Sequence, residues 1–235
     1  MCELSLILLS LIVEEGLPPA TSEEAKDERA LNIRIIDKVC YITLVLQSLH
    51  NTLFTLLCNE QNWKTRATAY DDLKALLLSD PTVCNEYAEF LDKMSCDSNA
   101  SALDGGLDAA IVFADVAPAG FMKQYTDKLV GNVVEKALGA RASTQAKGKV
   151  LVLKLMEIDD PIAATSFLLT KLADKKPKVP PLCLEIIKDG VIAYGARPFP
   201  IKEIIASLSA VFNGTNGPAR EMAMSLALEI SKLVA

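Results

Sequence analysis

Short polar turns recur along this chain from residue 62 onward at a nearly regular interval. The residues that mark them are separated by 36, 42, 35 and 40 positions, and they are Trp63, Asn99, Arg141, Lys176 and Asn216. Between successive markers lie two apolar stretches with helical periodicity, joined by a second kind of turn that contains proline. This spacing predicts a solenoid, in which each unit is one pair of antiparallel helices.

The periodicity predicts helices near 63–79, 83–96, 101–116, 121–138, 143–158, 161–173, 179–195, 199–212 and 218–234. No strand-like alternation interrupts them, and only 6% of the residues are aromatic, which favours packed helices over a β-sandwich. A period near 40 residues is that of the HEAT and armadillo class. We therefore predict an all-α fold, a HEAT-repeat α-solenoid. One helix pair cannot bury its apolar face alone, so neighbouring pairs are expected to share a continuous core. Examples of such faces are Leu151, Leu153, Leu155 and Met156, and Leu226, Leu228 and Ile230.

Residues 1–59 do not follow the repeat and are predicted to form a divergent N-terminal extension. A helix that ends near Cys58 could complete the first helix pair. The apolar run 4–13 lacks preceding Lys or Arg and is too short to span a membrane. Residues 39–58 are longer but contain polar side chains, so a buried helix is favoured over a membrane-spanning one, which stays open as an alternative.

Charge and cysteine patterns exclude several classes of function. The formal net charge is -6, which disfavours wholesale binding to nucleic acid. The six cysteines form no C-x-x-C pair and fit no zinc pattern, so we expect no metal and a reducing compartment. His50 is the only histidine, no Gly-rich phosphate loop is present, and Asp159-Asp160 reads as helix capping. The chain is therefore not expected to be an enzyme.

Stacked repeats place equivalent turns along one edge, and the residues there predict a binding surface. Turns on the opposite edge, such as Ser79-Asp80-Pro81, are mostly neutral or acidic. Lys64, Arg66 and Arg220 lie at helix starts, where the helix dipole disfavours cations, so capping of terminal carbonyls explains them poorly. That explanation suits Arg141 and Lys176 better. The predicted site residues are Trp63, Lys64, Arg66, Asn99, Arg141, Thr144, Lys147, Lys176, Lys178 and Arg220.

Trp63 is the only tryptophan of the 235 residues, and it lies in the polar, basic segment Asn62-Trp63-Lys64-Thr65-Arg66. Trp and Arg are enriched at binding hot spots. A tryptophan is also usually well buried, so Trp63 could equally fill a gap in the core. Its exposure distinguishes the two interpretations.

The turns, taken in order, resemble those of the TOG domain, a HEAT-repeat family. The resemblance covers about residues 60–235, and it is greatest to the first TOG domain of the chTOG-type microtubule polymerases. No single motif is specific, but five in order at this period are. They are Asn62-Trp63-Lys64-Thr65-Arg66, Cys96-Asp97-Ser98-Asn99-Ala100, Gly139-Ala140-Arg141-Ala142-Ser143-Thr144, Asp174-Lys175-Lys176-Pro177-Lys178-Val179 and Asn216-Gly217-Pro218-Ala219-Arg220-Glu221.

This resemblance implies a module that binds the free, curved αβ-tubulin heterodimer. Trp63 would pack against β-tubulin, and the basic residues of the later turns would lie nearer α-tubulin. It further implies a role at growing microtubule plus ends and in the spindle, in the cytoplasm on microtubules, spindle poles or centrosome, with no cofactor and no membrane partner. Gly148 and Pro180-Pro181 depart from the family's preference for helix formers. The alternative is a generic HEAT scaffold for another acidic protein, with Trp63 in its core.

Overall fold

The computed structural model describes residues 35, 38, 52–53, 55–57, 61–159 and 161–234. The chain divides into two compact units, Met1–Thr52 and Leu53–Ala235. Most of the predicted extension lies outside the described residues, including the run 4–13, His50 and most of 39–58. No helix in the described part is long and apolar enough to cross a membrane.

The second unit is built from two rows of helices, and the described residues contain no strand, which confirms the predicted all-α solenoid. One row holds five long helices: α3 (Trp63–Ser79), α6 (Ala100–Val116), α8 (Ala142–Ile158), α10 (Val179–Tyr194) and α12 (Gly217–Val234). The other row holds shorter segments: η1 (Pro81–Val83), α4 (Cys84–Tyr87), η2 (Ala88–Phe90), α5 (Leu91–Cys96), η3 (Met122–Gln124), α7 (Thr126–Asn132), η4 (Val133–Ala137), α9 (Pro161–Thr170), η5 (Lys171–Ala173) and α11 (Ile201–Phe212).

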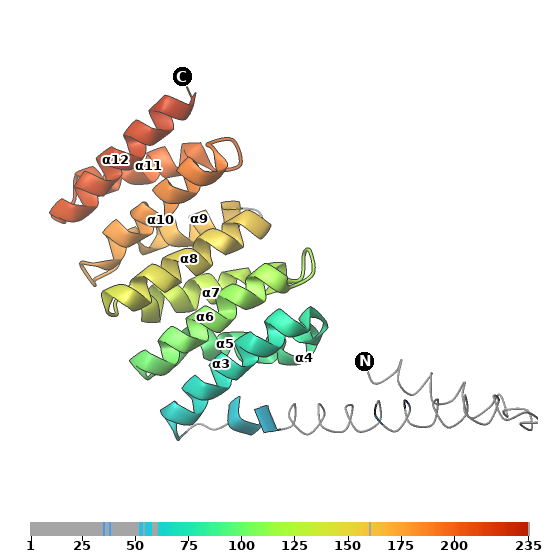
Figure 1. The fold of residues 1–235 in the computed structure, drawn as a ribbon. Coiled ribbons are helices and arrows are strands. Elements are labelled where there is room, and N and C mark those ends of the chain that lie inside the picture. Colours follow the sequence, from blue (N-terminus) through green and yellow to red (C-terminus); the bar gives the residue numbers. More distant parts are fainter. Residues whose placement is uncertain are drawn as a thin grey trace, which may run out of the picture. The chain divides into compact units, whose positions relative to one another are not determined.

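Successive helices of each row stack on one another, as Figure 1 shows from α3 to α12. In the first row α3 packs against α6, α6 against α8, and α10 against both α8 and α12. In the second row α5 packs against α7, and α7 against α9. The five long helices all begin at the same edge of the stack. This parallel arrangement is what brings the marker turns into one line.

The predicted single helix over 83–96 is wrong, because this segment is broken into α4, η2 and α5, preceded by η1. Its buried side chains still follow an apolar face, with Tyr87, Leu91 and Met94 almost fully enclosed. A 3₁₀ turn has 3.0 residues per turn instead of 3.6, and over a few residues the apolar pattern is too short to distinguish them. The pattern therefore located the face but not the helix type.

The core runs through the stack between the two rows of helices. Leu151, Leu155 and Met156 are buried as predicted. The predicted burial of Leu228 is wrong, since it is 53% exposed while Leu226 and Ile230 of the same helix are buried. Residues at i and i+4 share a helix face, and the residue midway between them points away.

Close helix contacts account for glycines at helix-interior positions. A methyl group on Gly148 of α8 would come within 2.9 Å of the side chains of Ala137 and Val133 in η4. Glycine therefore allows α8 to approach η4 closely, although it lowers helix propensity. Pro180 and Pro181 lie in the first turn of α10, where a missing backbone N–H costs little.

Candidate functional site

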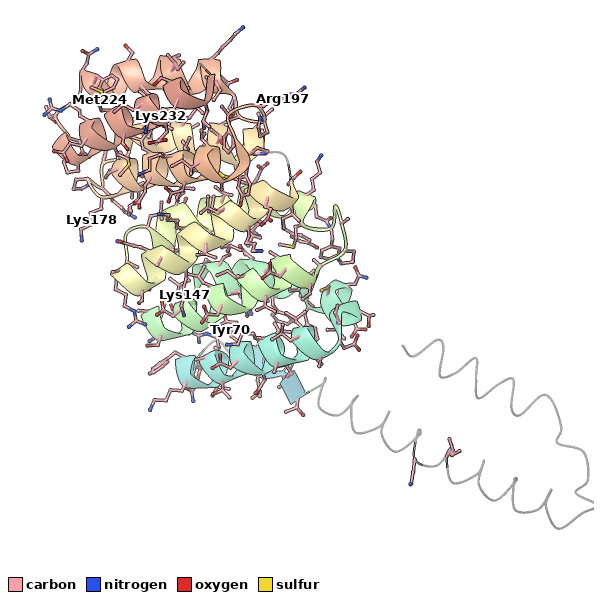
Figure 2. All side chains as sticks on the ribbon, turned by 45° about the horizontal axis from the view of Figure 1, so that its top comes forward. Tyr70, Lys147, Lys178, Arg197, Met224 and Lys232 are labelled. Carbon is pink, nitrogen blue, oxygen red and sulfur yellow. The ribbon has the colours of Figure 1, made fainter. Side chains whose placement is uncertain are left out.

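The candidate site is one edge of the second unit, which we call the turn edge. It comprises the turns 61–62, 97–99, 138–141, 174–178 and 213–216 together with the first helical turn that follows each. Figure 1 shows these turns in order along one side of the stack, where α3, α6, α8, α10 and α12 begin. Figure 2 shows Lys178 of this edge and Arg197 of the opposite edge on different sides of the unit.

Asparagine caps start three of the five long helices and so shape the turns. The side chain of Asn62 accepts hydrogen bonds from the amides of Lys64 and Thr65, at 3.0 and 3.5 Å. Asn99 does the same for Ser101 and Ala102, at 2.9 and 3.2 Å. Asn216 accepts from Ala219 N at 3.2 Å. These bonds satisfy amides that have no partner within the helix. Asn99, predicted as a binding residue, thus has a structural task in its own chain.

Trp63 is the first residue of α3 and is 38% exposed. The Lys64 ammonium lies 5.8 Å from the centre of its ring, within the range of a cation–π contact. The generic-scaffold alternative required Trp63 to fill the core, which does not agree with this exposure. An exposed tryptophan beside a lysine is the side-chain combination that a binding anchor needs.

Arg66 was predicted as an exposed binding residue, but the structure places it elsewhere. It is 8% exposed, and its Nε and Nη2 donate to the two carboxylate oxygens of Asp97 at 2.7 and 2.8 Å. The Tyr70 hydroxyl donates to the same carboxylate at 3.2 Å. Arg66 therefore joins the first turn to the second, and a buried guanidinium held in this way is not a surface contact. It sits at a helix start because Asp97, and not solvent, balances its charge.

The Asp97 carboxylate is held in its ionised form. Burial by itself would raise the pKa of Asp97, but the hydrogen bonds from Arg66 and from the Asn99 amide outweigh it, so the pKa lies below its usual range. For Tyr70 the balance differs: burial and the nearby Asp97 charge both raise the pKa of the hydroxyl. The phenol therefore stays protonated and able to donate.

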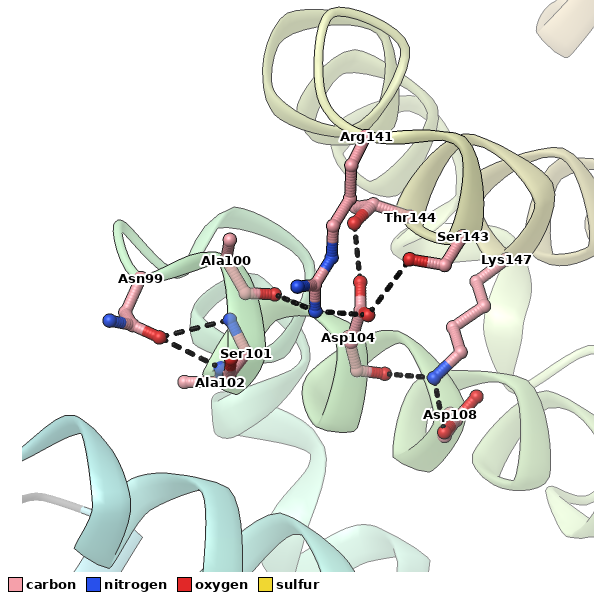
Figure 3. A network of polar contacts seen from close by, with 10 residues as sticks. All are labelled: Asn99, Ala100, Ser101, Ala102, Asp104, Asp108, Arg141, Ser143, Thr144 and Lys147. Carbon is pink, nitrogen blue, oxygen red and sulfur yellow. Dashed lines mark hydrogen bonds and ion pairs between the residues drawn. The ribbon is translucent and has the colours of Figure 1, made fainter.

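The third turn is fixed to α6 through Asp104, as Figure 3 shows. Arg141 Nη2 and the Ser143 hydroxyl donate to Asp104 Oδ2 at 2.6 and 3.2 Å, and the Thr144 hydroxyl donates to Asp104 Oδ1. Burial would raise the pKa of Asp104, but these donors lower it overall. Thr144 was predicted to face the partner, whereas it is fully buried and its hydroxyl is directed at Asp104.

Lys147 lies one helical turn beyond Thr144 and is also tied to α6. Its ammonium donates to the Asp108 carboxylate at 2.6 Å and to the Asp104 carbonyl at 3.1 Å. It is half-buried, so only part of its side chain faces solvent. Arg141 keeps about half of its side chain exposed, at 51%, despite the ion pair. The third turn therefore presents mainly Arg141.

The fourth and fifth turns carry further exposed cations. Lys176, Lys178 and Arg220 are all exposed. Lys176 Nζ lies 3.3 Å from the Glu135 carbonyl, a bond that leaves its charge uncompensated. Within the described part of the chain, neither Lys178 nor Arg220 has an ion pair. Of the predicted residues, the structure thus exposes one aromatic side chain at one end of the turn edge, with Lys64 beside it, and cations in the third, fourth and fifth turns.

Sequence reasoning did not find the acidic partners Asp97, Asp104 and Asp108. A signal was present, since Asp104 and Asp108 are four residues apart and share a helix face. Arg141, Thr144 and Lys147, at spacings of three, form the matching face one repeat later. Among the described residues, no group of three or more His, Cys, Asp or Glu side chains could hold a metal ion.

A helical solenoid whose turn edge carries an exposed tryptophan and basic side chains belongs to the class of HEAT-repeat binding modules. Residues 55–235 match the family model XMAP215/Dis1/CLASP, TOG domain. The chain belongs to this family, and the predicted fold and family are confirmed. The narrower prediction of a first TOG domain stays a prediction.

Individual relatives agree with the family assignment. The chain is 24% identical over 182 residues to protein mini spindles of Drosophila melanogaster, covering 75% of this chain and 9% of that protein. It is 25% identical over 176 residues to the spindle pole body component alp14 of Schizosaccharomyces pombe, covering 72% and 22%. The matched part of the chain thus spans 9% and 22% of the length of these two relatives.

Solved structures agree on the fold. The MAST/Orbit N-terminal domain superposes with a TM-score of 0.67 at 20% identity, covering 78% of this chain and 83% of that chain. A TOG domain of Zyg9 from C. elegans superposes with a TM-score of 0.66 at 17% identity, covering 91% and 87%. At such identities the likeness concerns the arrangement of helices, and the roles of single residues rest on the geometry above.

Proposed function

We propose that residues 55–235 bind the free αβ-tubulin heterodimer through the turn edge. The observation that carries this proposal is the exposure of Trp63 at one end of an edge whose third, fourth and fifth turns present cations. Family membership supports it, as does a structural relative described in terms of tubulin recruitment and assembly by microtubule polymerases with TOG domain arrays. That relative superposes with a TM-score of 0.64 and is covered to 39% by this chain.

Trp63 and the cations have different energetic roles in this proposal. Trp63 is the anchor, because an aromatic side chain gains most when it is desolvated at the centre of a contact. Lys64, Arg141, Lys176, Lys178 and Arg220 set the register and speed of association with an acidic surface, with Lys147 contributing less. Arg66, Thr144 and Asn99 shape the turns and make no direct contact with tubulin.

The cellular role follows from the same proposal. Relatives include proteins named for the spindle, the spindle pole body and the centrosome. We propose that this domain acts in the cytoplasm on the microtubule cytoskeleton, holding unpolymerised, curved tubulin close to growing plus ends. A single domain binds the heterodimer, whereas polymerase activity requires an array of domains and attachment to the lattice.

Co-elution with purified tubulin on a size-exclusion column at low salt tests the proposal. Wild type is expected to shift the tubulin peak, and Trp63→Ala with Arg220→Ala to abolish the shift at unchanged helicity. Loss of a hot-spot tryptophan costs about 2 kcal/mol or more of binding free energy. The matched controls are Leu78→Ala, which removes a 63% exposed side chain near the other end of α3, and Arg197→Ala on the opposite edge.

Two outcomes would count against the proposal. No shift by wild type would rule out tubulin binding by this domain. An undiminished shift by the double variant would leave tubulin binding intact and remove the turn edge as its site. Raising the salt concentration should weaken the wild-type complex, because the cations act through solvent-exposed charges.

A further inference from the structure

A groove crosses the turn edge where α8, α10 and α12 begin. Its volume is about 690 Å³, within the range that is usual for ligand-binding pockets in proteins. The apolar part of its lining comes from Pro177, Pro181, Leu182, Pro218 and Met222. None of these five residues is among the predicted binding residues, whereas Lys178, which is one of them, lies at the rim, so the groove is a further feature of the turn edge.

The groove is preformed by bonds between neighbouring repeats. The Asn216 side chain donates to the Pro177 carbonyl at 2.9 Å, which ties the fifth turn to the fourth. The same side chain caps α12 through the Ala219 amide at 3.2 Å. Prolines 177, 181 and 218 fix the backbone around the groove further, because their φ angles cannot vary. A rigid apolar groove binds at a low cost in conformational entropy.

The charges of the groove favour an acidic neighbourhood around its occupant. Glu185 is the only carboxylate in the lining, and Lys149 neutralises it at 2.7 Å. Lys149 also contacts Asp189 at 2.5 Å, and Lys188 lies 4.0 Å from Asp189, so two lysines balance the two carboxylates behind the groove. Lys178, which is exposed, then sets the charge at the rim. An apolar side chain would match the apolar lining of this groove, and carboxylates beside that side chain would match the charge of Lys178.

We infer that the groove receives an apolar side chain from an acidic loop of the tubulin heterodimer bound by the turn edge. This inference rests on the proposed function and adds a second anchor to it. Trp63 inserts into the partner at one end of the edge, and the partner inserts into this chain at the other. Contacts of opposite direction at the two ends would fix the register of the partner better than cations alone, which tolerate sliding.

Thr215, an exposed turn residue in the groove lining, offers the test. Thr215→Trp fills the groove without entering the core, and it is expected to weaken binding to purified tubulin about tenfold or more in calorimetry. Thr215→Ala should change the affinity less than about twofold. Ala119→Trp adds the same bulk at an exposed position on the opposite edge and should bind as wild type does. Met222→Gln, which keeps the side-chain length but makes the floor polar, should weaken binding in the same direction as Thr215→Trp.

The outcomes separate this inference from the proposed function. If wild type binds and Trp63→Ala does not, while Thr215→Trp and Met222→Gln both bind as wild type does, the groove is not used and the inference falls alone. If wild type does not bind, the proposed function and the inference fall together. An unfolding temperature close to that of wild type shows for each variant that a loss of affinity is not caused by unfolding.

Discussion

Arg66 and Asp97 form a two-point ion pair between the first and second turns, with Nε–Oδ2 and Nη2–Oδ1 distances of 2.7 and 2.8 Å. Both side chains are shielded from solvent, at 9% and 2% exposure. Two parallel hydrogen bonds through Nε and Nη2 require the guanidinium and the carboxylate to be coplanar, so the pair fixes the direction of each partner as well as their separation. The pair thereby fixes the position of the first turn of α3, which carries Trp63, relative to the first turn of α6.

Asp97→Ala should destabilise the domain strongly, because Arg66 would remain buried with no opposite charge. Removing one partner of a buried ion pair costs about 3–5 kcal/mol. Urea unfolding followed by circular dichroism gives the free energy. Asp71→Ala is the matched control, since Asp71 makes an exposed pair with Lys74 at 3.1 Å and should change stability by less than about 1 kcal/mol. Equal losses of unfolding free energy in both variants would show that the buried pair stabilises the domain no more than the exposed one.

Stability should fall in acid partly through Asp97 and Asp104. The folded pKa of each lies below its unfolded value of about 4. The unfolded chain therefore takes up protons first as the pH drops, and the contribution, complete above about pH 5, is lost as the pH falls through the folded pKa. Urea midpoints across this range should decline less steeply for Asp104→Asn than for wild type. Parallel declines would mean that Asp104 is not shifted.

Gly106→Ala and Gly105→Ala should act in opposite directions although the residues are neighbours in α6. A methyl group on Gly106 would collide with the backbone carbonyl of Met94, which cannot move aside as a side chain could. The expected loss is about 1–3 kcal/mol or more. On Gly105 the nearest atom is the Ala67 carbonyl oxygen at 3.7 Å, an ordinary contact, so the gain in helix propensity of up to about 1 kcal/mol should prevail. Thermal unfolding of both variants distinguishes them, and two losses of equal size would contradict the packing described.

The long helices were predictable because their signals are local. Asn62 and Asn99 stand where a cap is needed, and the apolar period runs on from each, so the starts of α3 and α6 agree with the predictions to within one residue. The exposure of Trp63, Lys178 and Arg220 on one edge was predictable as well, since the repeat period places every marker turn there, and their role in binding stays a prediction.

The contacts between neighbouring repeats could not be predicted, because they join residues that are far apart in the sequence. Asp97 lies 31 residues from Arg66, and Asp104 lies 40 from Thr144. Whether such side chains meet depends on how far each repeat is shifted against the next, which helical periodicity does not encode. For that reason Arg66 and Thr144 were predicted to be surface residues of a polar turn, although each makes a buried contact between repeats.

The indirect role of Arg66, which positions Trp63 without contacting tubulin, can be tested by combining Arg66→Lys with Trp63→Ala. Lysine keeps the charge but loses the two-point geometry, so the first turn should loosen while the domain stays folded. If Arg66 acts only by positioning Trp63, Arg66→Lys should weaken tubulin binding in the wild-type background and have no effect once Trp63 is alanine. A direct contact between Arg66 and tubulin would instead give the same loss in both backgrounds. Calorimetric titration of the four proteins measures this coupling. Arg220→Ala serves as the control, because it lies in the fifth turn and its effect should add to that of Arg66→Lys.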